Sequence, residues 1–221
     1  MRRCRRYRPE LVCEGRPAVL RFCIDRYEYP NIAGARPVVM VDYFQAERAC
    51  RLEGKRLCEV EEWTFACEGR EIWPYPYGLE RDAAACNFDR GYRQPDLGAF
   101  ARPHEVSIEV ERLDQRVLSG APARCTSPFG VHDMTGNVDE WAHDPRGSRH
   151  KPPYDTALKG GYWGPIRARC RPQTGSHNGW FRFYQVGFRC CADTLDGRPA
   201  RELLPRTVRL PRRQRIRAPG D

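Results

Sequence analysis

Eleven cysteines are the residues of this chain best suited to chemistry. A cysteine can act as a nucleophile, ligate a soft metal or join a second cysteine in a disulfide. No C-x-x-C occurs, and no close pair is matched by a second close pair, so the spacing does not favour zinc. Spread along the chain, they indicate disulfide partners in an oxidising compartment. They are Cys4, Cys13, Cys23, Cys50, Cys58, Cys67, Cys86, Cys125, Cys170, Cys190 and Cys191.

Two of these cysteines are neighbours, in the stretch QVGFRCC. Adjacent cysteines are hard to join to each other without strain. Cys190 and Cys191 are therefore each expected to have a partner elsewhere in the chain.

The charge of the chain is concentrated at its two ends. The 221 residues carry a net charge of +9, of which residues 1–10 contribute +4 and residues 198–221 contribute +6, so the rest carries −1. We expect a basic disordered arm at 1–10, a single domain at 11–197 and a basic disordered tail at 198–221. No nucleic-acid motif accompanies the tails, so nucleic acid is not the expected partner.

The location of the protein is inferred from the cysteines together with the apolar segments of the chain and its first residues. No apolar run reaches the roughly 18 residues that a membrane span needs. The start MRRCRRYRPELVC has no apolar segment of a signal peptide behind its charges. We expect a periplasmic or secreted protein whose export signal is missing from this start.

The elements that must position these residues are short. Apolar and polar residues alternate through 19–27 and predict a strand, and a second strand is expected at Val38–Val41. Asp42 is suited to cap a helix that Gly54 ends, and a second helix fits Glu59–Cys67. Little periodicity is seen from Arg70 to Leu158, which predicts a loop-rich region. Two strands follow, in DTALKGGYW and YQVGFRCCAD.

Five motifs, in order, resemble those of one family. They are VDYFQAERACRLEGKRLCEVEEWTFACEG, YPYG, SPFGVHDMTGNVDEW, LKGGYW and VGFRCCAD. Together they are similar to the sulfatase-modifying-factor family, which includes the formylglycine-generating enzymes, over roughly residues 24–193. The resemblance implies an α+β, C-type-lectin-like fold that is loop-rich, with short strands and two or more short helices.

The resemblance also implies two disulfides, Cys50–Cys190 and Cys67–Cys170. Three further links are expected by elimination. Cys13 and Cys23 flank a possible hairpin, Cys86 and Cys125 bracket the irregular region, and Cys58 and Cys191 remain. The last pair has an alternative role as a redox pair.

The copper chemistry of the family does not carry over. Its oxidases bind copper(I) through two cysteines between the G-G-S strand and the structural cysteine. Here that interval reads GGYWGPIRARC, which has no cysteine before Cys170. Copper is therefore not expected. None of His104, His132, His143, His150 and His177 shows metal-ligand spacing.

Calcium is the expected cofactor. The resemblance implies a site formed by Asp133, the carbonyls of Gly136 and Val138, and Glu140. The hard oxygens and the bent Gly-Asn turn suit this ion. A second site would use Asn87, the carbonyl of Phe88, Asp114 and the carbonyl of Arg116. Asp139, where many relatives have Trp, is expected to face solvent.

These residues support two functional hypotheses. The first is a non-oxidase binding or accessory module with an unknown protein, peptide or small-molecule ligand. Aromatic and arginine side chains suit such a groove, and the candidates are Trp163, Arg169, Trp180 and Arg182. The second is an oxidoreductase that acts on a protein or small-molecule thiol through residues that the motifs do not reveal.

Overall fold

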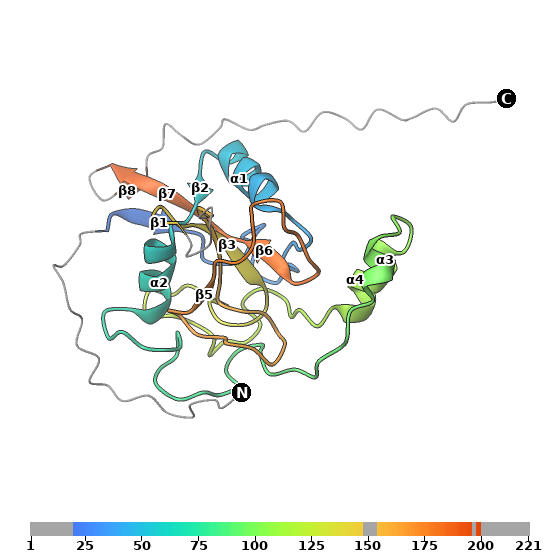
Figure 1. Cartoon of the computed structure of the whole chain (residues 1–221). Helices are drawn as coiled ribbons and strands as arrows, with labels where there is room; N and C mark the ends of the chain where they lie inside the picture. Colours follow the sequence, from blue (N-terminus) through green and yellow to red (C-terminus); the bar gives the residue numbers. More distant parts are fainter. Residues whose placement is uncertain (1–19, 148–153, 196–197, 200–221) are drawn as a thin grey trace.

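The structure, a computed structural model, describes residues 20–147, 154–195 and 198–199 (Figure 1). Cys4, Cys13 and His150, and nearly all of the two expected basic tails, lie outside these residues.

Two small sheets form the centre of the fold (Figure 1). In the first, β7 (Cys190–Leu195) lies between β1 (Phe22–Ile24) and β2 (Arg56–Leu57), and β8 (Arg198–Pro199) also pairs with β7. β8 shows that the first two residues of the expected tail belong to a sheet. In the second sheet the order is β5 (Gln173–Thr174), β4 (Thr156–Lys159), β3 (Asp139–His143) and β6 (Val186–Phe188). β3 and β6 are parallel, and the other pairs are antiparallel.

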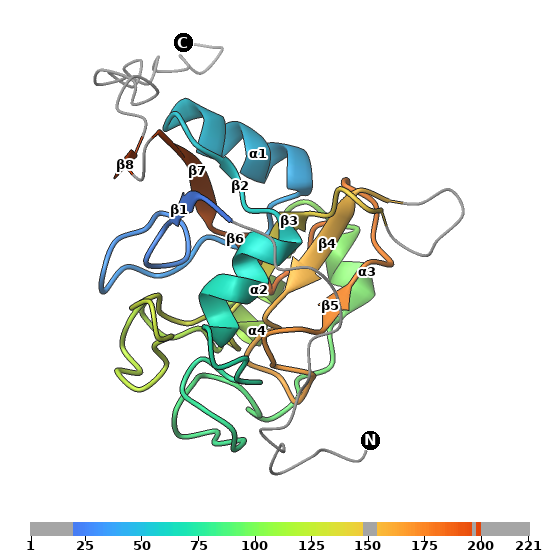
Figure 2. The same ribbon diagram turned by 90° about the vertical axis from the view of Figure 1, so that its left-hand side faces the viewer.

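Two helices lie against these sheets (Figure 2). α1 (Tyr43–Leu52) starts at Asp42, whose carboxylate accepts from the N–H of Gln45 at 2.8 Å. Gly54, with a φ of +70°, follows its end. These ends are the expected ones, because the cap and the glycine are local signals.

The second helix, α2 (Val60–Glu68), buries one face. Val60, Trp63 and Cys67 on this face are almost completely buried. Glu62 accepts from the backbone N–H of Glu59 at 2.9 Å and so stabilises the first turn. The helix contacts β3 and β4, which brings it beside the second sheet.

The extended segment from Val186 to Leu195 contributes one strand to each of the two sheets. β6 ends at Phe188 and β7 begins at Cys190, so only Arg189 separates them. Successive side chains of a strand point to opposite faces. Cys190 and Cys191 therefore point in opposite directions, and each has its own partner.

The structure corrects one expectation about elements and adds to another. Residues 38–41 do not form a strand, because Met40 has a φ of +62° and turns the backbone. The region after Arg70 is loop-rich, as expected, but it also contains β3 and two helices, α3 (Leu97–Phe100) and α4 (Val106–Leu113). Val106, Val110 and Leu113 stand at helical spacing, and this signal could have predicted α4.

No helix in the described part of the chain is both long and apolar enough to cross a membrane.

Candidate functional site

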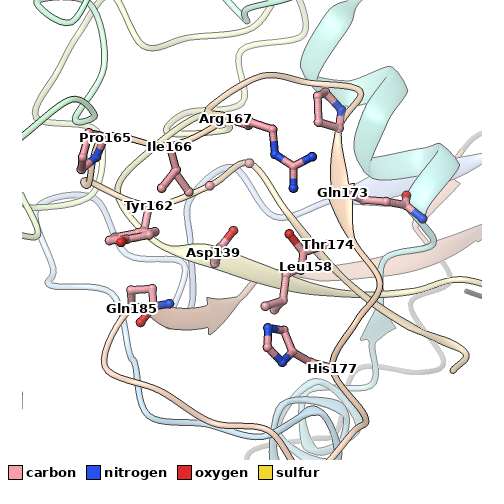
Figure 3. A pocket seen from close by; sticks show the side chains of 13 residues that line it. Asp139, Leu158, Tyr162, Pro165, Ile166, Arg167, Gln173, Thr174, His177 and Gln185 are labelled. Carbon is pink, nitrogen blue, oxygen red and sulfur yellow. The ribbon is translucent and has the colours of Figure 1, made fainter. Parts of the chain in front are cut away.

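A cavity of about 330 Å³ lies between the start of β3 and the loop that follows β4 (Figure 3). This volume is within the range of small-molecule sites. Residues from the segment 160–167 form one wall, and residues from the segment 172–177 form another. The lining consists of Asp139, Leu158, Gly160, Gly161, Tyr162, Pro165, Ile166, Arg167, Pro172, Gln173, Thr174, His177 and Gln185.

Asp139 is the one carboxylic acid in this lining. It is the first residue of β3 and only 9% exposed, which corrects the expectation that it faces solvent. Burial raises the pKa of Asp139 to about 7, although the N–H of Gly161 donates a hydrogen bond that lowers it. Gly161 has a φ of +74°, and a side chain there would collide with Ile166. The glycine is therefore needed to bring this N–H to the carboxyl group.

Gln185 lies next to Asp139 in the lining (Figure 3). The backbone N–H of Asp139 donates to the carbonyl of Gln185 at 2.9 Å, so β3 and the residue before β6 fix the pair. The side-chain Oε1 of Gln185 is buried without a hydrogen-bond partner. A buried acceptor without a donor is costly, and this atom, which has almost no accessible surface, is covered by protein rather than open to the cavity.

The other polar lining residues surround this pair. Arg167 is exposed and lowers the pKa of Asp139 through its positive charge. The ring of His177 stacks on Phe181, with centroids 3.7 Å apart. Burial raises the pKa of Tyr162, which shares a hydrogen bond with Tyr184. The tyrosine is therefore a neutral group in the cavity at physiological pH.

Four disulfides connect the helices and loops to the C-terminal strands. They are Cys50–Cys190, Cys58–Cys191, Cys67–Cys170 and Cys86–Cys125. These are four of the five expected pairs. Such a set indicates an oxidising compartment. Cys58 and Cys191 are joined, and both are almost completely buried.

The fifth expected link, Cys13–Cys23, is not supported. Cys23 has a free thiol, and Cys13 lies outside the described residues. A local hairpin was expected to bring the two together. β1 instead pairs with β7, so Cys23 lies opposite Ala192.

A buried ion pair lies on the other side of β3. Arg189 donates from Nε to Glu140 Oε2 at 2.6 Å and from Nη2 to Oε1 at 2.7 Å. Trp63 Nε1 also donates to Oε2, at 2.7 Å. Arg189 and Glu140 are both 0% exposed. Burial alone would lower the pKa of Arg189, but the charge and hydrogen bonds of Glu140 together with the charges of Glu28 and Asp133 outweigh it, and the pKa is raised.

Two more buried carboxyl groups accompany this pair. Glu28 accepts from Asn137 Nδ2 at 2.7 Å and from Val138 N at 3.1 Å. Burial, and then the charges of Asp133 and Glu140, raise the pKa of Glu28 well above its usual value. Burial also raises the pKa of Asp133 to about 6. Its Oδ2 accepts from Gly120 N at 2.7 Å, whereas its Oδ1 is buried without a partner.

Lys159, opposite Glu140 in the β3–β4 register, does not supply a full countercharge. It is 1% exposed, and burial lowers its pKa to about 7. Its Nζ donates to the carbonyl of Arg171 at 3.1 Å and lies 5.2 Å from the ring centre of Trp63. Arg189 is therefore the main positive charge among these buried carboxylates.

Comparison with known proteins identifies the family. Residues 23–194 match the family described as "Sulfatase-modifying factor enzyme 1-like domain". The chain belongs to this family.

Individual relatives are distant and longer. The chain is similar to inactive C-alpha-formylglycine-generating enzyme 2 of Bos taurus, at 28% identity over 76% of this chain and 53% of that protein. It is also similar to the serine/threonine-protein kinase pkn1 of Chlamydia caviae, at 29% identity over 70% of this chain and 24% of that protein. The chain thus spans about half of the first relative and about a quarter of the second.

A solved structure has a fold similar to that of this chain. The crystal structure of CarF matches with a TM-score of 0.52 and 17% identity, over 73% of this chain and 69% of that one. This likeness supports the α+β, loop-rich fold of the sulfatase-modifying-factor family. The more distant likeness to C-type lectins stays a prediction.

The expected first calcium site of the family lies in the turn before β3. Asp133, Gly136 and Asn137 all have positive φ, and a Cβ at Gly136 would lie 2.4 Å from the carbonyl oxygen of Asn87. Glu140 is already held by Arg189 and Trp63. Among the residues that the structure describes, no group of three or more His, Cys, Asp or Glu side chains suits a metal. Calcium here would depend on backbone carbonyls, as the expected set of Asp133, Gly136, Val138 and Glu140 does.

The expected second site of the family has arginines beside its side chains. Arg90 Nε donates to Asn87 Oδ1 at 2.9 Å. Arg116 and Arg36 both form ion pairs with Asp114, at 2.7 and 2.9 Å. Phe88 is buried in the core. The two side-chain acceptors expected at this site already have positively charged donors, so the structure offers it less support than the first.

The expected groove residues do not line the cavity. Trp163 is buried among Leu113, Val138 and Tyr184. Trp180 is 71% exposed and packs against Phe44, away from the lining. Arg169 and Arg182 are not part of the lining either. The residues that the sequence interpretation missed are Asp139, Arg167 and Gln185, and the signal available was the Asp at a position where many relatives have Trp.

Proposed function

We propose that this chain is a binding or accessory module of the sulfatase-modifying-factor family, without copper oxidase activity. The cavity beside Asp139 holds its ligand, which is a small molecule or part of a protein or peptide. The chain covers only part of the length of its relatives. Any statement about the activity of the whole protein therefore belongs to this proposal.

The lining of the cavity is the observation that supports this most. Copper(I) in an oxidase needs two thiolates near the substrate. No cysteine lines the cavity, and Cys170, the nearest along its loop, is joined to Cys67. A sulfur in a disulfide is not a thiolate and cannot ligate in this way. The relative from Bos taurus, whose name includes "inactive", agrees with this proposal.

An activity assay tests the oxidase question. We expect no stoichiometric copper(I) binding and no conversion of cysteine to formylglycine in a sulfatase-motif peptide, because the cavity offers no thiolate. Mass spectrometry of the peptide reads the result directly. Copper-dependent turnover that survives Cys23→Ser would refute the proposal and favour the oxidoreductase alternative. Turnover lost in Cys58→Ser or Cys191→Ser would move the active site to that pair.

We also propose that the Asp133 turn binds calcium. The ion would contact Asp133, the carbonyls of Gly136 and Val138, and Glu140. Two observations support it: the unpartnered Oδ1 of Asp133, and three buried carboxyl groups beside a single guanidinium. If all three carboxyls are ionised, Arg189 and one Ca²⁺ would together balance their charge.

Thermal unfolding tests the calcium site. Calcium at about a hundred times its Kd should raise the free energy of unfolding by about 2.7 kcal/mol. Asp133→Ala should abolish this rise, whereas Asp82→Ala, which removes a partly exposed carboxylate paired with Arg124, should retain it. A wild-type melting temperature that is the same in calcium and in chelator would exclude the site.

The compartment follows from the disulfides. An oxidising compartment is indicated by the four links. We propose that this is an extracytoplasmic location, either periplasmic or secreted.

A further inference from the structure

We propose that the outward face of α1, together with the adjacent loop that carries Trp180, binds the surface of an anionic lipid membrane. This surface, the Trp180 face, consists of Phe44, Arg48, Leu52, Trp180 and Arg182. None of these residues lines the cavity beside Asp139. The inference therefore goes beyond the proposed function and does not rest on it.

The first support is the pattern of α1, which lies on the outside of the fold in both views (Figure 1, Figure 2). The buried residues of this helix share one side, at i, i+3 and i+7: Tyr43, Ala46 and Cys50. At about 100° per residue, Phe44, Arg48 and Leu52 project from the opposite side, in line along the helix. Phe44 is 43% exposed and Leu52 is 56% exposed. The outer side of a surface helix is normally polar, so these two apolar side chains are available to a partner.

The second support is Trp180, which extends this apolar surface. Its side chain is 71% exposed, and its ring centre lies 4.5 Å from that of Phe44. The loop is held against α1, because the N–H of Tyr43 donates to the carbonyl of Gly179 at 3.0 Å. Trp is typical of the membrane–water interface, where the ring meets apolar chains and the indole N–H meets water. The pair of rings is thus placed to enter between lipid headgroups.

The third support is the charge around these rings. Arg48 and Arg182 are exposed, and neither forms an ion pair within the part of the chain that the structure describes. Glu47, the acidic residue on α1, is already paired with Arg51 at 2.9 Å. Asp155 is an exposed carboxylate whose charge reaches the start of α1. Two unpaired arginines therefore outweigh one carboxylate, and the face complements anionic headgroups.

The charge of the whole chain favours an extended anionic surface over a single acidic peptide. Residues 1–10 carry +4 and residues 198–221 carry +6. The Trp180 face is the outer side of a helix, which is convex and would not enclose a peptide as a groove does. A membrane can contact this face and attract both basic segments at once, whereas a short acidic peptide would reach only part of the charge.

Vesicle binding followed by tryptophan fluorescence tests the inference. Trp180 is the exposed one of the five tryptophans, since Trp63, Trp141 and Trp163 are almost completely buried and Trp73 is half-buried. The probes are vesicles of phosphatidylcholine, with and without about a third phosphatidylglycerol. Only the anionic vesicles should sediment the protein, shift its emission to shorter wavelength and quench it when their acyl chains are brominated. Binding should weaken as the salt concentration rises.

Variants connect the binding to the Trp180 face. Trp180→Gln should lower the affinity for anionic vesicles about tenfold, because an apolar side chain no longer leaves water. Arg48→Gln and Arg182→Gln should each lower it about fivefold. The matched control is Ile108→Gln, which removes an apolar side chain of similar exposure, 66%, on α4 and should leave the affinity unchanged. A melting temperature within a few degrees of wild type confirms that each variant is folded.

Several results would overturn the membrane face. One is the absence of binding to anionic vesicles at millimolar lipid. Another is binding that Trp180→Gln leaves as strong as Ile108→Gln does, which would show that the basic ends alone hold the protein. A third is an emission shift caused by a peptide of alternating glutamate and leucine but not by vesicles, which would favour a protein partner. The non-oxidase proposal would stand after each of them, since it is tested by the peptide conversion assay.

Discussion

Replacement of Cys50 and Cys190 by alanine should lower the free energy of unfolding by about 2–5 kcal/mol. The bond joins α1 to the first residue of β7 across a sequence separation of 140 residues, and both cysteines are fully buried. In the chain-entropy account, a link across so long a segment strongly restricts the unfolded chain. Denaturant unfolding measures the loss, in a background where Cys4, Cys13 and Cys23 are serine to prevent thiol exchange.

The matched control is the Cys86–Cys125 link. It spans only 39 residues, and its cysteines are also buried. The double alanine variant of this pair should lose about 1 kcal/mol less than that of the first pair, because the entropy of loop closure grows with the logarithm of length. A larger loss for the Cys86–Cys125 pair would show that local packing, rather than loop entropy, sets the effect.

Arg189→Met should be the most damaging single substitution in the interior, with a loss of about 3–5 kcal/mol. The arginine side chain is 0% exposed and donates twice to Glu140 and once to the carbonyl of His132, at 2.9 Å. Without it, Glu140 is left near Glu28 and Asp133 with no positive group of comparable charge. Denaturant unfolding with calcium held constant measures the loss.

Two variants show whether the unpaired charge is the cause. Arg189→Met combined with Glu140→Gln removes both charges and should recover part of the stability. Arg51→Met breaks an exposed pair with Glu47 and should cost at most about 0.5 kcal/mol. If the combined variant is no more stable than Arg189→Met, the loss comes from the shape of the arginine side chain and its carbonyl contacts.

Local signals account for the parts of the fold that the sequence predicted. Asp42 and Gly54 define the ends of α1, since a cap and a left-handed glycine act within a turn of their own position. Motif order identified the family, because five matches in sequence do not depend on knowing any contact. The same reasoning failed at residues 38–41, where an apolar run was interpreted as a strand but Met40 turns the chain.

The cysteine pairs show which disulfides could be predicted from family resemblance and which could not. Cys50–Cys190 and Cys67–Cys170 came from the resemblance and Cys58–Cys191 from elimination, and all three are present. Elimination paired Cys23 with Cys13, but Cys23 is a free thiol and Cys13 lies outside the described residues.

The sequence by itself determined the family, the loop-rich α+β class and the absence of a cysteine between Gly161 and Cys170, because these depend on residue identity and order. The tertiary structure decided which side chains meet in the cavity. Asp139, Arg167 and Gln185 come from three separate segments, and the loop after β4 covers the start of β3 and removes Asp139 from water. Alternation along a strand tells which residues share a face, but only packing of distant segments decides which face becomes a cavity and which becomes solvent-exposed.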